Sequence, residues 1–218
     1  EATLYTSGLG GYRATFNERP LDPTSVRGSV TEWNNRTLYF ADDVTSDVQR
    51  AVAVSSVDAG TVAIGVELYK HWYGLQNKFY PLAYGPRSLK AVLIVTHVNG
   101  TTSYVLPTCS LSAGKKCAWR HGNVSSTTYE DLHTGQSGDG RLAVPGWESP
   151  HFDRSLLSLW SVPAAVVGPR GELRPRLMPR SRVLEIARPI SVGLVTGDPF
   201  SPPGKTYRFT LPHEVAGF

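Results

Sequence analysis

Short runs of β-branched and aromatic residues, separated by turn-forming residues, constrain the fold of this chain more than any other feature. The clearest runs are residues 61–69 and 91–98, and both end at turn signals. Sixteen prolines and 21 glycines are scattered along the sequence, so few segments could continue as a long helix. The pattern predicts an all-β fold: a β-sandwich or jelly-roll-like arrangement of antiparallel sheets, with long loops and little helix.

Further segments share this composition, with glycine or proline between them. They are residues 25–33, 37–40, 51–57, 102–106, 141–144, 156–162, 182–187, 190–196 and 206–211. Strand-like runs continue on both sides of two other segments, 123–140 and 163–179, which we expect to be long exposed loops. The sequence therefore predicts a single all-β domain spanning residues 1–218.

One hairpin has a strong local signal. Residues 92–98 and 102–106 are joined across Asn99 and Gly100. An Asn-Gly pair accepts the positive φ angles of a type I′ turn at little cost. We therefore expect these two runs to pair as antiparallel strands.

A second hairpin and one helix are weaker predictions. Residues 58–60 have turn chemistry and would join strands at 51–57 and 61–69. Only residues 42–50 have the pattern of a short helix, with Asp or Thr near its start as the N-cap.

The composition supports a real core and argues against some partners. The apolar fraction is 40%, and the formal charge is only +4, with 16 arginines and six lysines. Because a nucleic-acid binder needs a dense basic face, we expect no specific nucleic-acid binding. No apolar run approaches the roughly 18 residues that span a bilayer, and no basic-then-apolar leader begins the sequence, so we expect no transmembrane segment.

The two cysteines, Cys109 and Cys117, have seven residues between them. Gly114 makes this segment flexible enough to close a disulfide, which is the interpretation we favour over two free thiols. A zinc site is disfavoured because no second Cys or His pair stands at ligand spacing.

Three of the six asparagines begin an Asn-X-Ser/Thr sequon. These candidate glycosylation sites are Asn35, Asn99 and Asn123. Together with the predicted disulfide, they predict an extracellular, cell-surface or virion-surface location.

Aromatic residues are concentrated between positions 69 and 84, interleaved with Lys, His, Gln and Asn. The candidate binding residues there are Tyr69, His71, Trp72, Tyr73, Phe79, Tyr80 and Tyr84. Ring faces beside hydrogen-bonding groups suit a sugar or a protein partner. The alternative is that the rings cap one end of the core under a long loop.

An arginine- and proline-rich stretch covers residues 170–182. Its candidate binding residues are Arg174, Arg176, Arg180 and Arg182. Guanidinium groups at this density could bind a sulfated glycan, a phosphate or a carboxylate-rich partner by bidentate contacts. The alternative is a solvated crossover loop whose arginine stems pack over apolar surface.

A hydrolase site receives weak support. Ser137 lies between glycines, and several acids and bases are near it in sequence: Glu130, Asp131, His133, His151 and Asp153. However, the segment is not the strand–elbow–helix pattern of a nucleophilic serine, and no helix follows it. Paired carboxylates for glycoside cleavage cannot be chosen from eighteen acids. We therefore predict no catalytic residues.

No metal or cofactor is predicted. His213 and Glu214 begin like a zinc-binding His-Glu-X-X-His motif, but Gly217 stands where the second ligand is needed. The acidic clusters, Asp42-Asp43 with Asp47 and Glu130-Asp131, lack the spacing of a calcium loop. The phosphate-binding glycine motifs of nucleotide sites are missing from the sequence.

Two short segments carry a resemblance. Residues 3–6 (Thr-Leu-Tyr-Thr) and 206–211 (Thr-Tyr-Arg-Phe-Thr-Leu) resemble the way trimeric viral fibre heads begin and end their β-sandwich. The resemblance covers about ten residues of generic strand sequence and transfers no binding residue. It implies a viral attachment or capsid-protrusion domain.

These observations give three ranked hypotheses. The leading one is a non-enzymatic recognition domain, such as a viral capsid head or spike or a secreted lectin-like module, whose loops bind a glycan or protein receptor by multivalent contact in a homo-oligomer. The second is a structural subunit of a capsid or extracellular filament. The third is a secreted hydrolase that acts on glycans.

Overall fold

A computed structural model of the chain describes residues 1–53, 60–75, 84–109, 117–122, 124–179, 185–195 and 206–212. The chain divides into two compact units, Glu1–Pro179 and Arg180–Phe218, and each is described by itself. Nothing tests the single-domain prediction, so it stays a prediction. In the described part of the chain, no helix is both long enough and apolar enough to span a bilayer.

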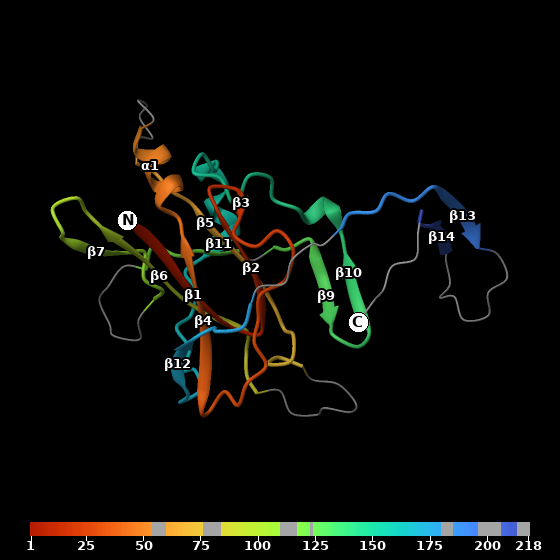
Figure 1. The fold of residues 1–218 in the computed structure, drawn as a ribbon, viewed down its shortest axis with the longest axis horizontal. Helices are drawn as coiled ribbons and strands as arrows, with labels where there is room; N and C mark the ends of the chain where they lie inside the picture. Colours follow the sequence, from red (N-terminus) through yellow and green to blue (C-terminus); the bar gives the residue numbers. More distant parts are fainter. Residues whose placement is uncertain are drawn as a thin grey trace. The chain divides into compact units, whose positions relative to one another are not determined.

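The first unit is built mainly from strands (Figure 1). In chain order its elements are β1 Ala2–Leu9, β2 Gly11–Phe16, β3 Arg19–Pro20, β4 Arg36–Asp43, α1 Thr45–Ala53, β5 Ile64–Tyr69, β6 Ser88–Thr96, β7 Thr102–Val105, β8 His121–Gly122, β9 Thr127–Asp131, β10 Gly135–Gly138, the 3-10 helices η1 Gly140–Leu142 and η2 Arg154–Leu159, β11 Trp160–Ser161 and β12 Glu172–Pro175. The second unit contains β13 Ser191–Val195 and β14 Thr206–Thr210.

Two sheets form the body of the first unit. The larger has the strand order β12-β4-β1-β6-β7, and the smaller has the order β3-β2-β5. Strand β1 lies at the centre of the larger sheet and pairs antiparallel with both β4 and β6. Strand β12 is the exception, because it pairs parallel with β4. The remaining strands form the pairs β10-β9, β11-β8 and β13-β14. The predicted all-β fold with little helix is confirmed.

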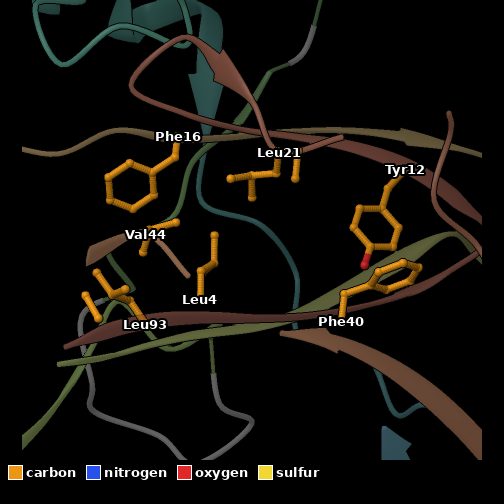
Figure 2. Packing of buried hydrophobic residues seen from close by; sticks show 9 residues of the cluster. Leu4, Tyr12, Phe16, Leu21, Phe40, Val44 and Leu93 are labelled. Carbon is orange, nitrogen blue, oxygen red and sulfur yellow. The ribbon is translucent and has the colours of Figure 1, made fainter. Parts of the chain in front are cut away.

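The core lies between the two sheets (Figure 2). Alternate residues of β2 point inward, so that Tyr12, Ala14 and Phe16 are buried against side chains of the larger sheet. Leu4 of β1 and Leu93 of β6 meet them from the other side and are fully buried. This alternation on both inner faces is what a β-sandwich requires.

A polar cluster is built into the same interior. The Arg27 guanidinium donates two hydrogen bonds to the Asp42 carboxylate, at 2.6 and 2.9 Å, and both side chains are buried. The same guanidinium lies 4.9 Å from the centre of the Phe40 ring. Burial raises the pKa of Tyr12 to about 12, so its hydroxyl stays neutral beside the Thr6 hydroxyl, 2.9 Å away.

Most long strand predictions are confirmed, and several short ones are wrong. Strands at 37–40, 61–69, 91–98, 102–106, 190–196 and 206–211 correspond to β4, β5, β6, β7, β13 and β14. Residues 25–33 form only an isolated bridge, between Arg27 and Tyr12, and residues 141–144 lie in or beside the 3-10 helix η1. The strand predicted at 156–162 is confirmed only at 160–161, which form β11, because residues 156–159 belong to η2. Where these predictions are wrong, apolar side chains stand on irregular or 3-10 backbone, which hydrophobic periodicity does not distinguish from a strand. Of 182–187, only 185–187 are described, and they are not a strand.

The two predicted loops contain strands. Residues 123–140 include the β9–β10 hairpin, and residues 163–179 include β12. Both are largely exposed, so neither shows the apolar alternation that identifies a half-buried strand.

The hairpin between β6 and β7 is confirmed, but its predicted turn type is wrong. The His97 carbonyl accepts from Gly100 N–H at 2.9 Å, and His97 N–H donates to Thr101 at 2.8 Å. Gly100 has a φ of 80°, whereas Asn99 is not among the residues with positive φ. This is a three-residue turn with a glycine bulge. The Asn99 side chain accounts for it, because its oxygen accepts from the Thr101 N–H and hydroxyl.

A helix replaces the second predicted hairpin. Helix α1 begins later than the predicted 42–50 and continues to Ala53, so the strand predicted at 51–57 is wrong where it is described. The Asp43 carboxylate accepts from Thr45 N–H at 2.9 Å, and Val48 N–H donates to the carbonyl of buried Val44. Gln, Arg and Ala at 49–51 favour helix, which lets this turn propagate.

Candidate functional site

The predicted aromatic stretch divides into a buried part and a surface part. Tyr73 is buried with Trp33, and their ring centroids are 5.1 Å apart in an edge-to-face arrangement. Tyr84 contacts the same Trp33 ring at 4.6 Å but is itself exposed. Tyr69 donates to the Glu67 carboxylate, and Phe79 and Tyr80 lie outside the described residues. Tyr73 therefore fits the alternative interpretation, in which rings pack into the interior.

The surface part meets the β9–β10 hairpin. The Glu130 carboxylate accepts from the backbone N–H of Lys70 at 2.7 and 2.9 Å and from that of His71 at 3.3 Å. Trp72 lies edge-to-face with His133, with centroids 5.5 Å apart. Two segments 60 residues apart in sequence thus form one surface, which we call the Trp72–Glu130 surface and define by Lys70, His71, Trp72, Glu130 and His133.

The polar contacts of the Trp72–Glu130 surface centre on the Glu130 carboxylate. Burial lowers the pKa of His71 below its ordinary value, and the nearby Glu130 carboxylate opposes this shift. His71 also has a φ of 48°, a left-handed conformation that the Glu130 bonds help to hold. Arg87 adds a longer ion pair to Glu130, at 3.5 Å. The Glu130 carboxylate therefore accepts hydrogen bonds that hold the two segments together.

The arginine stretch lies on a different element, β12. Arg174 forms an exposed ion pair with Glu172 at 2.8 Å. The Arg176 guanidinium lies 4.8 Å from the centre of the Phe40 ring, and its backbone N–H donates to Tyr39 at 3.0 Å. Arg180 and Arg182 lie outside the described residues. Arg176 thus packs against β4, which fits the alternative of stems packed over apolar surface, whereas the ion pair of Arg174 stays within β12.

The acids near Ser137 have structural roles. Asp131 accepts from the N–H groups of His133 and Thr134, and these bonds lower its pKa. Asp153 accepts from Ser155 N–H in the same way, at the start of η2. Ser137 is exposed on β10, opposite Tyr129. In the part of the chain that the structure describes, no three His, Cys, Asp or Glu side chains are grouped to hold a metal ion.

The predicted covalent features are only partly described. Cys109 and Cys117 form a disulfide, with Cα atoms 5.2 Å apart. Asn35 and Asn99 are exposed in turns, and Asn123 lies outside the described residues. Glycosylation of all three, and the extracellular, cell-surface or virion-surface location, stay predictions.

Sequence reasoning missed a second aromatic cluster. The Trp160 ring centroid lies 6.1 Å from that of Trp147 and 5.9 Å from that of Phe152. The neighbouring Glu148 has a raised pKa, because it is partly buried and lies near the carboxylates of Glu67 and Glu18. A glycine inside a strand, Gly65, was the available signal, since it marks a place where another segment approaches closely.

Comparison with known proteins decides the family. Residues 1–185 match the family model described as the alpha-L-rhamnosidase N-terminal domain. The chain belongs to this family. An alpha-L-rhamnosidase from Streptomyces avermitilis is 31% identical over 154 residues, which cover 70% of this chain but 13% of the relative. This rhamnosidase N-terminal domain therefore spans about an eighth of that relative's length.

Solved structures share the fold of this rhamnosidase N-terminal domain. An alpha-L-rhamnosidase from Dictyoglumus thermophilum matches 91% of the chain with a TM-score of 0.68 and 24% identity, over 19% of its own length. The Streptomyces avermitilis alpha-L-rhamnosidase complexed with L-rhamnose matches 78% of the chain with a TM-score of 0.56 and 27% identity, over 15% of its length. An enzyme from Aspergillus terreus matches 73% of the chain with a TM-score of 0.53.

The family corrects the functional predictions. The viral attachment head, capsid or spike protein, secreted lectin-like module and filament subunit are all wrong for a rhamnosidase N-terminal domain. The ranking of the three hypotheses is also wrong, because the relatives are glycoside hydrolases, the class ranked last. The physical reason is that strand alternation and turn residues predict the β-sandwich fold, and the same fold serves proteins of many unrelated functions. The ten residues resembling fibre heads are generic strand sequence.

Proposed function

We propose that this chain is the non-catalytic N-terminal domain of an enzyme that hydrolyses α-L-rhamnosides. The observation that carries the proposal is the family match over residues 1–185. The Streptomyces avermitilis relative supports it, because the aligned part is 13% of that enzyme and leaves most of its length for a catalytic part.

The geometry supports a non-catalytic role. Glycoside cleavage usually needs two carboxyl groups facing each other across the scissile bond. Among the described acids, Asp42 and Asp47 are held in ion pairs, and Asp131 and Asp153 accept backbone bonds in turns. The two-sheet body, with its buried core, suits a supporting part of a larger enzyme.

Glu148 is the residue of this chain at which the non-catalytic role can be tested most directly. It lies near Glu67, and its raised pKa is the property that a general acid needs. In the complete protein that carries this chain, Glu148→Gln and Glu67→Gln should leave the rate of p-nitrophenyl α-L-rhamnoside hydrolysis within about twofold of the parent. A loss of about a thousandfold or more in either variant would place catalysis in this domain and overturn the proposal.

The substrate class is tested on the same complete protein. It should release p-nitrophenol from the α-L-rhamnoside much faster than from the matching β-D-glucoside or α-L-arabinoside. Equal rates on all three, or none on the rhamnoside, would contradict the proposed function.

A further inference from the structure

The second unit contains an antiparallel pair of strands, β13 and β14, with one apolar and one mostly polar face (Figure 1). Val192 lies opposite Phe209, and Leu194 lies opposite Tyr207. Because side chains alternate between the faces of a strand, these four residues lie on one face. We call this set the hairpin face.

The hairpin face is continuous and exposed. Its four side chains are between 51% and 61% exposed. Ile190 N–H donates to the Thr210 carbonyl at 2.8 Å, which continues the pairing and brings Ile190 and Leu211 into register beside the face. Both of these side chains are exposed as well.

The opposite face of the hairpin is mostly polar. It carries Ser191, Gly193, Arg208 and Thr210, all exposed, with Val195 partly buried at the loop end. This division into an apolar and a polar face is typical of a sheet that packs on one side only. An isolated two-stranded hairpin is marginally stable in water, so the hairpin face needs a cover.

The position of the hairpin in the sequence indicates what covers it. Residues 191–210 follow the last residue of the family match, residue 185, and belong to the second compact unit. The chain spans only 13% of the Streptomyces avermitilis enzyme and 19% of the Dictyoglumus thermophilum enzyme. A large remainder of such a polypeptide is therefore available beside the hairpin.

We propose that the hairpin face is a docking surface for an apolar surface in the part of the rhamnosidase polypeptide that this chain does not include. The hairpin then belongs to the packing of the next part of the enzyme. This inference rests on the proposed function, because it requires the longer polypeptide.

Hydrogen exchange compares the 218-residue chain with the complete protein that carries it. The amides of β13 and β14 should exchange at least about tenfold more slowly in the complete protein, since covering the apolar face stabilises the pairing. Equal protection in both proteins would assign the cover to this chain or to a second copy of it. That result, or fast exchange in both, would overturn the inference.

Two matched variants test the face itself. In the complete protein, Phe209→Ser should remove most of the added protection, while the control Thr210→Ser on the polar face should keep it. Equal effects of the two variants would contradict a docking surface. If Phe209→Ser fails to fold, the comparison of the two unsubstituted proteins still decides.

Rhamnoside hydrolysis is measured on the same preparation, so that the two proposals can fail separately. An active protein whose β13–β14 amides exchange freely would overturn the docking surface and leave the proposed function standing. An inactive protein with protected β13–β14 amides would overturn the proposed function and leave the docking surface standing.

Discussion

At the residue scale, the Arg27–Asp42 pair makes the centre of the first unit depend on charge as well as on apolar packing. The two side chains are 1% and 5% exposed. Arg27 also exchanges two backbone hydrogen bonds with Tyr12, which fixes an irregular segment to β2. A buried pair of this kind is weak evidence of net stabilisation, but removing one partner leaves an uncompensated buried charge.

We therefore expect Asp42→Asn to lower the free energy of unfolding by about 3–5 kcal/mol. The matched control is Glu172→Gln, which breaks the exposed pair with Arg174 and should cost at most about 1 kcal/mol. Urea unfolding at pH 7 measures both. Similar losses in the two variants would show that burial does not set the strength of these ion pairs.

Asp47 gives the fold a dependence on pH. It is buried and accepts hydrogen bonds from Arg19 and Arg50, and the bond from Arg19 is the main reason why its pKa lies below the ordinary value of 3.8. A lowered folded-state pKa stabilises the fold fully above the unfolded value, and this stabilisation is lost as pH falls through the folded value. Stability should therefore decline on acidification below about pH 4.

Asp47→Asn should remove part of that decline. The difference in free energy of unfolding between pH 7 and pH 3 should be smaller in the variant than in the parent, because the variant has no carboxylate to protonate there. Paired urea titrations at the two pH values measure the difference. An identical decline in both proteins would show that Asp47 does not contribute.

At the element scale, the outer face of the β3-β2-β5 sheet is covered by the segment around Trp147. A Cβ on Gly65 would lie 2.6 Å from the Thr15 hydroxyl oxygen, 3.0 Å from the Trp147 ring and 3.1 Å from Glu148. Glycine on β5 therefore lets this segment lie directly against the strand.

Gly65→Ala should lower the free energy of unfolding by about 1–3 kcal/mol, because the cover must move away. The control is Gly140→Ala, where no atom lies within 4 Å of the new Cβ, and its effect should stay within about 0.5 kcal/mol. Chemical denaturation with Trp fluorescence follows both variants. If Gly65→Ala left the free energy of unfolding unchanged, the segment around Trp147 would not pack tightly against β5.

The elements differ in how well the sequence predicts them. The β6–β7 hairpin is predictable because Asn99 and Gly100 are adjacent to β-branched runs. Strand β2 is not among the predicted strands, since Gly11, Arg13 and Ala14 have low strand propensity, and partners far along the chain fix it in the sheet. Strand β12 is missed for a similar reason: its pairing with β4 spans more than 130 residues and leaves both of its faces exposed.

The candidate site is less predictable than the fold. The aromatic stretch signals concentrated rings, but only tertiary contacts decide that Tyr73 packs inside with Trp33 while Trp72 meets His133. Glu130 is assigned to a weak hydrolase set by proximity in sequence, whereas in the structure it accepts from the backbone amides of Lys70 and His71 and pairs with Arg87. A local sequence pattern shows which residue types are present. It does not show which partner each ring or polar group contacts, because that depends on the tertiary fold.

At the scale of the whole molecule, the chain has a packed sandwich core, and Asp42 and Asp131 are held in structural hydrogen bonds, which is the basis of the proposed non-catalytic role. The chain aligns with only 13% and 15% of the length of the two Streptomyces avermitilis rhamnosidase matches, which leaves most of each relative for a separate catalytic part.

The most direct test compares initial rates of p-nitrophenyl α-L-rhamnoside hydrolysis at equal molar concentration, for the 218-residue chain and for the complete protein that carries it. The account predicts turnover by the complete protein and no release above the buffer rate by the chain alone. Turnover by the isolated chain would contradict the account, because the active site would then lie within this domain.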